Sequence, residues 1–202
     1  MRTKILAPVY ELMKEVYGVD MSYVRINMED LGDNILGQFR PNESYIDIAI
    51  NEDFFSVVTD DFIGVEEFKG AIALLQATVI HELNHVAQHA LNKAISIDTE
   101  YSIDIDIISE FEEKIGVPYA EQSVEIDSRL MEFLFIVRNH RELAGDYMRH
   151  VFSGVSSNSQ TMNSAIEVLQ HKCPELLHEL LNAMNEYKLV GGIIRWKELK
   201  RN

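Results

Sequence analysis

The spacing of apolar residues changes twice in the first half of the chain, and each change predicts a different kind of element. Over residues 5–17 the apolar residues recur at helical intervals that stop at Gly18, which predicts a first helix. Residues 23–28, 35–40 and 45–51 form three short runs, of which the last two alternate in part and are rich in isoleucine and aromatic side chains. Pro41 and three polar residues separate those two runs, so we expect a small, mostly antiparallel sheet with a hairpin.

The remaining pattern is helical. Residues 71–80 are apolar on almost every side, as in a buried helix, and we expect one long helix over about residues 66–92. A helix over residues 103–115 should end at Gly116, Val117 and Pro118, and a second major helix should cover residues 119–139. We expect an α+β fold with a main domain over residues 1–152 and a C-terminal helical extension over residues 153–202. The extension contributes helices near residues 161–170 and 174–187, and another helix over residues 141–152 precedes it.

Inside the long apolar helix, His81, Glu82 and His85 form the sequence HExxH. Positions four apart in a helix lie about 6 Å apart along its axis and on nearly the same face, so two imidazoles can converge on one zinc ion. Glu82 points about 100° away around the axis, where its carboxylate can accept a proton from a zinc-activated water. These parts predict hydrolysis of an amide bond. The plain alternative is a helix end that emerges into solvent with its polar groups hydrated.

A catalytic zinc ion usually takes three protein ligands, so this motif requires a third. In metzincins the third is a histidine that follows a glycine, but Gln88 and Leu91 occupy those two positions here. His89 lies about 12 Å along the axis from His81, so we expect it at the surface or against a ligand rather than on the ion. Three carboxylates of the next major helix remain as candidates: Glu121, Glu125 and Asp127.

With HELNH on one helix and EIDSR on a later one, the chain resembles the gluzincin-type metallopeptidases, broadly the minimal bacterial and phage peptidases of the IrrE/ImmA group. The first motif alone is also similar to SprT-like proteins, which usually complete the site with a third histidine. The gluzincin resemblance implies a zincin-like fold, Glu125 as the third ligand and Asp127 as a residue that orients a ligand histidine. It also implies an edge strand beside the active-site helix that can pair with an extended peptide. The chain departs from the pattern at Ser128, where alanine is usual, and at Glu121, a competing carboxylate one turn earlier.

Two points stay open in the sequence. Acidic and basic residues recur every three to four positions around Glu125, so the plain alternative is a solvated stripe with an ion pair to Arg129 worth about 0.3 to 0.5 kcal/mol. Peptide hydrolysis also needs a hydrogen-bond donor for the oxyanion. Four side chains are candidates for that donor: Tyr119, Tyr147, His140 and His150.

Composition narrows the partners and the compartment. The 202 residues carry 33 acidic and 18 basic side chains, a net charge of −15 that disfavours nucleic acid and anionic membranes. No 18-residue apolar segment is present, and the first residues lack the apolar region of a signal peptide. The single cysteine, Cys173, excludes an internal disulfide, so we expect a cytoplasmic protein.

The expected function is a zinc metallopeptidase with one catalytic Zn²⁺ that acts as an endopeptidase on a protein or peptide substrate. The alternative is a non-catalytic homologue that binds metal and serves as a sensor or a protein-binding module. Glu82 favours the enzyme, because a purely structural zinc site has no use for a base at that position.

Overall fold

The computed structural model describes residues 3–17, 24–33, 35–40, 46–91, 105–119, 122–144, 147 and 178. The chain divides into two compact units, Met1–Ala90 and Leu91–Asn202. The domain boundary after residue 152, the helices at 161–170 and 174–187 and most of the helix at 141–152 lie outside the described residues, so those sequence predictions stay predictions. Among the described residues, none of the helices combines the length and the apolar character that crossing a membrane requires.

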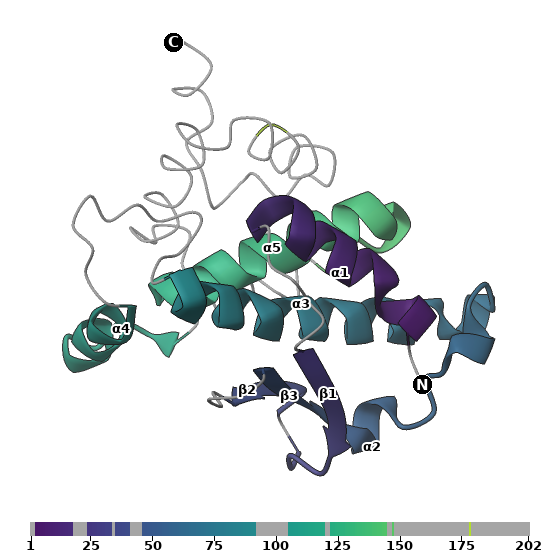
Figure 1. Ribbon diagram of the computed structural model, residues 1–202, viewed down its shortest axis with the longest axis horizontal. Helices are drawn as coiled ribbons and strands as arrows, with labels where there is room; N and C mark the ends of the chain where they lie inside the picture. The colour runs from purple at the N-terminus through teal and green to yellow at the C-terminus, as the bar shows by residue number, and fades with distance from the viewer. Residues whose placement is uncertain are drawn as a thin grey trace. The chain divides into compact units, whose positions relative to one another are not determined.

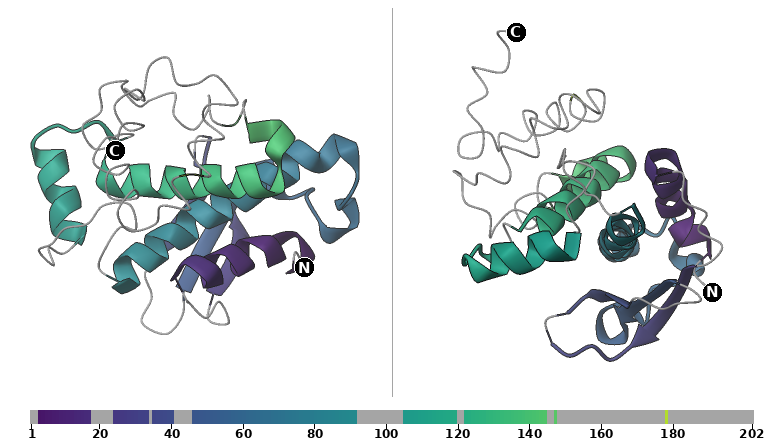
Figure 2. Two further views of the ribbon diagram at one scale, coloured as in Figure 1. Left: turned by 90° about the horizontal axis from the view of Figure 1, so that it is seen from above. Right: turned by 60° about the vertical axis from the view of Figure 1, so that its left-hand side comes forward.

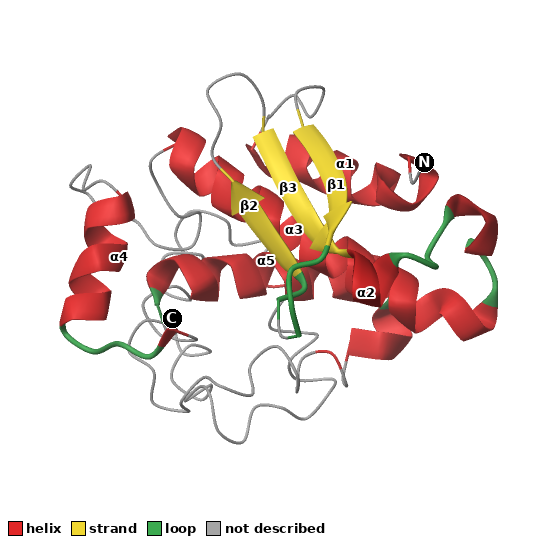
Figure 3. Ribbon diagram, turned by 90° about the horizontal axis from the view of Figure 1, so that it is seen from below, coloured by secondary structure: helices red, strands yellow, loops and turns green. Residues whose placement is uncertain are grey.

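The first unit contains a three-stranded sheet in the order β1-β3-β2 (Figure 1, Figure 3). Strand β1, Val24–Glu29, pairs in parallel with β3, Ile46–Asn51, whereas β2, Gly37–Arg40, pairs with β3 in antiparallel. The prediction of a mostly antiparallel sheet is therefore wrong, because the sheet is mixed. Residues 48–50 are fully buried on both faces, which suits the central position, and β3 accordingly lies between the two strands that precede it in the chain.

Two helices cover the same face of this sheet (Figure 1, Figure 2). They are α1, Thr3–Tyr17, and α3, Lys69–Leu91, which confirms the two helices predicted for this half of the chain. The side-chain amide of Gln76 in α3 donates a buried hydrogen bond of 2.5 Å to the carbonyl oxygen of Ile5 in α1. This bond joins the two helices through a polar group that burial would otherwise leave unsatisfied.

The side chain of Asp60 caps the start of α1 from a distant position in the chain. The carboxylate of Asp60 accepts hydrogen bonds from the backbone N–H groups of Lys4 and Ile5 at 3.3 and 3.0 Å. The first N–H groups of a helix have no partner within the helix, and a negative charge there is favourable. Asp60 therefore acts as a cap that comes from more than fifty residues further along the chain.

A buried asparagine organises the connection into the short helix α2, Glu52–Phe55, which the sequence pattern did not predict. Asn51 is fully buried, and its side-chain oxygen accepts from the N–H of Asp53 at 3.1 Å. Its amide group donates to the carbonyl oxygens of Gly32 and Ile35, both at 2.7 Å. One side chain thus caps α2 and fixes the loop before β2, which positions that edge strand.

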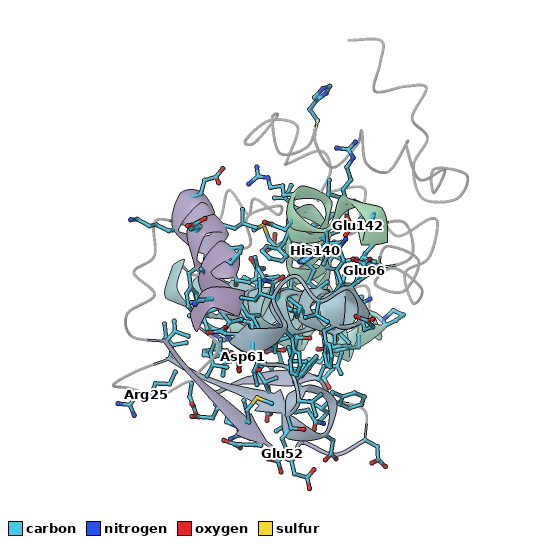
Figure 4. All side chains as sticks on the ribbon, turned by 90° about the vertical axis from the view of Figure 1, so that its right-hand side faces the viewer. Arg25, Glu52, Asp61, Glu66, His140 and Glu142 are labelled. Atoms are coloured by element: carbon cyan, nitrogen blue, oxygen red, sulfur yellow. The ribbon has the colours of Figure 1, made fainter. Side chains whose placement is uncertain are left out.

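The face of the sheet away from α1 and α3 carries polar side chains, and Figure 4 shows Arg25 pointing outward from β1.

The second unit contributes α4, Ile105–Lys114, and α5, Ser123–Asn139, with a 3-10 turn at Arg141–Leu143. Helix α4 lies beside the N-terminal end of α5 and runs across it (Figure 2). Gly116 has a φ of 78°, a conformation that favours glycine, and it ends α4 where the sequence predicted. Glu112 of α4 caps α5, because its carboxylate accepts from the backbone N–H of Ser123 at 2.8 Å and from the Ser123 hydroxyl.

Helix α5 is buried along nearly its whole length, including several polar side chains. Glu125 is only 3% exposed and Glu132 only 8%, while Asp127 is fully buried. The alternative of a solvated acidic stripe is therefore wrong. Charged carboxylates are costly to bury unless hydrogen bonds or cations stabilise them, so the surroundings of these residues decide what α5 can do.

Candidate metal centre

The histidine pair of α3 already has the geometry of a chelating pair. The Nε2 atoms of His81 and His85 lie 3.0 Å apart, and the two rings meet edge to face with centroids 4.7 Å apart. Two nitrogens that bind the same zinc ion at about 2.0 to 2.1 Å in tetrahedral geometry are about 3.3 Å apart. Lone pairs that face each other at this distance repel unless a proton or a cation lies between them. The spacing therefore suits a shared cation.

A glutamine on the same helix orients one of these rings. The Nδ1–H of His85 donates to the side-chain oxygen of Gln88 at 2.9 Å, and Gln88 is almost fully buried. When Nδ1 carries the proton, Nε2 has the lone pair that binds a metal. A metzincin has glycine at the position of Gln88. Here the glutamine that replaces it forms a hydrogen bond with His85.

Glu82 is held by the edge strand of the sheet. Its Oε2 accepts a hydrogen bond of 2.7 Å from the backbone N–H of Phe39 in β2, and the side chain is 8% exposed. A hydrogen bond to a charged acceptor is about twice as strong as one between neutral groups, and here it stabilises a carboxylate that is largely removed from water. The Phe39 ring also contacts His89, with ring centroids 5.5 Å apart.

Strand β2 can approach α3 this closely only because residue 37 is glycine. A Cβ atom built on Gly37 would lie 2.7 Å from Cγ2 of Thr78, 3.1 Å from Cγ of Glu82 and 3.3 Å from its Oε1. The first of these distances is shorter than any normal contact between carbon atoms. The backbone of Gly37 therefore lies directly against the Glu82 side chain.

In the second unit, Glu125 has a tyrosine as its partner. The hydroxyl of Tyr119 donates to Oε1 of Glu125 at 2.6 Å. Tyr119 is 64% exposed, so the ring reaches the buried carboxylate from the solvent side. Tyr119 was one of the candidate oxyanion donors, and the structure shows its hydroxyl engaged with a candidate metal ligand.

His81, His85 and Glu125 together form a group that can hold a metal ion. Each offers one ligand atom, and these atoms lie within 4.8 Å of one another. Two nitrogens and one carboxylate oxygen are a ligand set that zinc accepts, and three protein ligands leave a fourth position for water or substrate. These are the two histidines of HExxH and the glutamate that the gluzincin resemblance implied as the third ligand.

The other candidates have different surroundings. Asp127 is fully buried in α5, and His89 is exposed at the end of α3. The hydroxyl of Tyr147 donates to Oε2 of Glu132 at 2.9 Å, and burial, followed by the nearby charge of Glu132, raises the Tyr147 pKa well above its ordinary value. His140 is half-buried at the C-terminal end of α5, near Glu142 (Figure 4). Two candidates lie outside the described residues: Glu121 and His150.

Three residues at the site were not found from the sequence. Gln88 had a usable signal, because a residue three positions after His85 shares its helical face. Gly37 had a weak one, since glycine within a strand often marks the close approach of another segment. Phe39 had none, because its contribution is a backbone N–H that every residue but proline carries.

Comparison with known proteins gave no match, since no family model fits the chain and neither a curated protein nor a solved structure is significantly similar to it.

Proposed function

We propose that this protein is a zinc-dependent peptidase in which His81, His85 and Glu125 hold the ion and Glu82 is the general base. The observation that carries the proposal is the 3.0 Å separation of the two Nε2 atoms, with a Glu125 oxygen in the same group of possible ligand atoms. The donor set of two imidazoles and one carboxylate favours zinc over the hard cations calcium and magnesium, which prefer oxygen ligands.

Zinc, when bound, would supply a Lewis acid that polarises the substrate carbonyl and lowers the pKa of a water molecule to about 7. The residues of the chain carry the remaining steps. Glu82 accepts the proton of the attacking water and passes it to the nitrogen of the departing amine. Gln88 keeps the proton of His85 on Nδ1. The Phe39 N–H keeps the Glu82 carboxylate in one orientation.

The ligand assignment can be tested without knowing the natural substrate. Zinc per chain is measured by mass spectrometry for wild type and for His81→Ala, His85→Ala, Glu125→Ala and Glu82→Gln. We expect one zinc ion in wild type and in Glu82→Gln, and loss of zinc in the other three variants. Purified wild type that holds no transition metal and takes up no zinc would contradict the proposal.

The catalytic assignment uses denatured, fluorescein-labelled casein as the probe. Glu82→Gln keeps the shape of the side chain but not its basicity, so cleavage should fall by roughly a hundredfold or more while zinc stays bound. Equal cleavage by wild type and Glu82→Gln would show that Glu82 is not the base. A non-catalytic metal-binding protein would bind zinc as expected and leave casein intact in every case.

A further inference from the structure

The Glu82 carboxylate is buried, and two residues of strand β2 contact the Glu82 side chain. We propose that edge strand β2 positions Glu82 for proton transfer, with the Phe39 N–H fixing the carboxylate and Gly37 providing the space that the carboxylate occupies. This inference rests on the proposed function, because it gives Gly37 and Phe39 a part in catalysis only if Glu82 is the base. Both residues act through Glu82 and are positioning residues.

The register of the sheet explains why the Phe39 N–H is directed at Glu82. The backbone N–H of Asn51 donates to the carbonyl oxygen of Leu36 at 2.9 Å, just beyond the end of β2. Paired residues of antiparallel strands alternate between bonded and non-bonded pairs, so Gln38 and Arg40 direct their N–H groups at β3. Gly37 and Phe39 direct theirs away from β3. On an edge strand such a group normally faces water, but here it meets a carboxylate from α3.

Gly37 acts through space rather than through backbone freedom. Its φ is not positive, so alanine can adopt the same backbone conformation. The obstacle is the set of contacts at 2.7 to 3.3 Å that an added methyl group would make with Thr78 and Glu82. Any side chain at position 37 must therefore move the Thr78 and Glu82 side chains or push β2 away from α3.

These contacts allow packing and positioning to be separated by mutation. The shortest contact involves only Cγ2 of Thr78, whereas the next two involve Glu82. Thr78→Ser removes that methyl group and keeps the hydroxyl, which donates to the carbonyl oxygen of Leu74 at 2.9 Å. In the double variant Gly37→Ala/Thr78→Ser the severe clash is gone and the contacts with Glu82 remain. The reference proteins are wild type, Thr78→Ser and Gly70→Ala, since a Cβ on Gly70 has no neighbour within 4 Å.

The first measurement follows amide hydrogen exchange by NMR in the zinc-loaded proteins and needs no substrate. The Phe39 amide should be protected in wild type, Thr78→Ser and Gly70→Ala. It should lose protection in Glu82→Ala and in the double variant, while the Gln38 and Arg40 amides stay protected by β3. Protection of the Phe39 amide that survives in Glu82→Ala would overturn the inference.

The second measurement is the steady-state cleavage of a quenched-fluorescent peptide chosen from those that wild type cleaves in a randomised library. We expect the double variant to melt close to Thr78→Ser and to hold one zinc ion. Its kcat should fall roughly ten- to a hundredfold with little change in KM, since small displacements of a catalytic group cost this much. A merely structural role would be rescued by Thr78→Ser, and kcat would return to that of the reference proteins.

The outcomes separate the two proposals. A double variant that loses Phe39 protection and keeps the kcat of Thr78→Ser overturns the positioning role and leaves the peptidase intact. If wild type cleaves no library peptide, the proposed function fails and the catalytic role of β2 fails with it. The exchange data would then show only that Glu82 binds the strand.

Discussion

Glu82 and Glu125 are both buried glutamates, yet different kinds of donor hold them. Glu82 accepts a backbone N–H from Phe39 at 2.7 Å, and Glu125 accepts the hydroxyl of Tyr119 at 2.6 Å. The backbone donor belongs to a sheet and cannot rotate away, whereas Tyr119 is 64% exposed and its side chain has rotatable bonds. A fixed donor suits the proposed role of Glu82 as a base that must meet one proton in one place. A rotatable donor suits the proposed role of Glu125 as a ligand that must adjust to an ion.

The two hydrogen bonds also differ in how easily a substitution can remove them. No side-chain substitution at position 39 other than proline removes the Phe39 N–H, so Glu82 is protected from most single changes at that site. The bond to Glu125 is lost whenever residue 119 lacks a hydroxyl group. The ligand carboxylate should therefore be the easier of the two to tune.

The largest expected effect is on zinc affinity, and it distinguishes Glu125 from Glu132, another buried glutamate of α5. Glu125→Gln replaces a charged ligand by a neutral amide, so zinc affinity should fall by more than the roughly 10- to 100-fold that outer partners of a ligand are worth. Glu132→Gln is the matched control, since Glu132 is a buried glutamate of the same helix that accepts from Tyr147. Zinc titration by calorimetry measures both.

Glu132→Gln should bind zinc as wild type does. If Glu125→Gln keeps full zinc affinity while Glu132→Gln loses it, the ligand on α5 is Glu132 and the assignment of Glu125 is wrong. A loss in both variants with a collapse of the melting temperature would indicate a damaged helix rather than a missing ligand.

A smaller effect on zinc affinity is expected from Tyr119, the tyrosine that donates to Glu125. Tyr119→Phe removes only the hydroxyl that Glu125 accepts, so zinc affinity should fall roughly 10- to 100-fold. Tyr147→Phe removes the corresponding hydroxyl from Glu132 and should leave zinc affinity unchanged. Competition with a chromogenic zinc chelator resolves differences of this size. Equal affinities for Tyr119→Phe and wild type would mean that Glu125 binds the ion without help from the tyrosine.

The smallest effect concerns a carboxylate that accepts backbone N–H groups at the surface. The N–H of Ile5, and then that of Lys4, lowers the pKa of Asp60 below its ordinary value of 3.8. Because the folded-state pKa is the lower one, this contribution to stability is present above pH 3.8 and is lost as the pH falls through the folded-state pKa.

Asp60→Asn should therefore lower the denaturant midpoint slightly at neutral pH, and the gap from wild type should close in acid. Denaturant unfolding at several pH values down to about 3 measures this difference. The neighbouring variant Asp61→Asn controls for the loss of one negative charge. A gap that stays constant with pH would show that Asp60 does not cap α1 as a carboxylate.

Much of the site could be predicted from the sequence because it depends on local geometry. The period of a helix places His81 and His85 on one face wherever the helix lies, and that spacing allows their Nε2 atoms to come within 3.0 Å. The end of α4 at Gly116 is equally local, since a positive φ favours glycine. The choice of Glu125 came from the resemblance of EIDSR to a family pattern rather than from periodicity.

Tertiary structure decided what depends on distant segments. The parallel pairing of β1 with β3 was missed because strand order depends on which strand can be buried on both faces, and the alternation within a single run does not show this. The cap that Asp60 places on α1 likewise joins residues far apart in the chain, and the burial of Glu125 depends on packing that periodicity does not show. The contact of Gly37 and Phe39 with Glu82 spans more than forty positions and uses a missing side chain and a backbone N–H. Gly37 leaves only a weak signal in the sequence and the Phe39 N–H leaves none, so the packing of β2 on α3 was needed to reveal this contact.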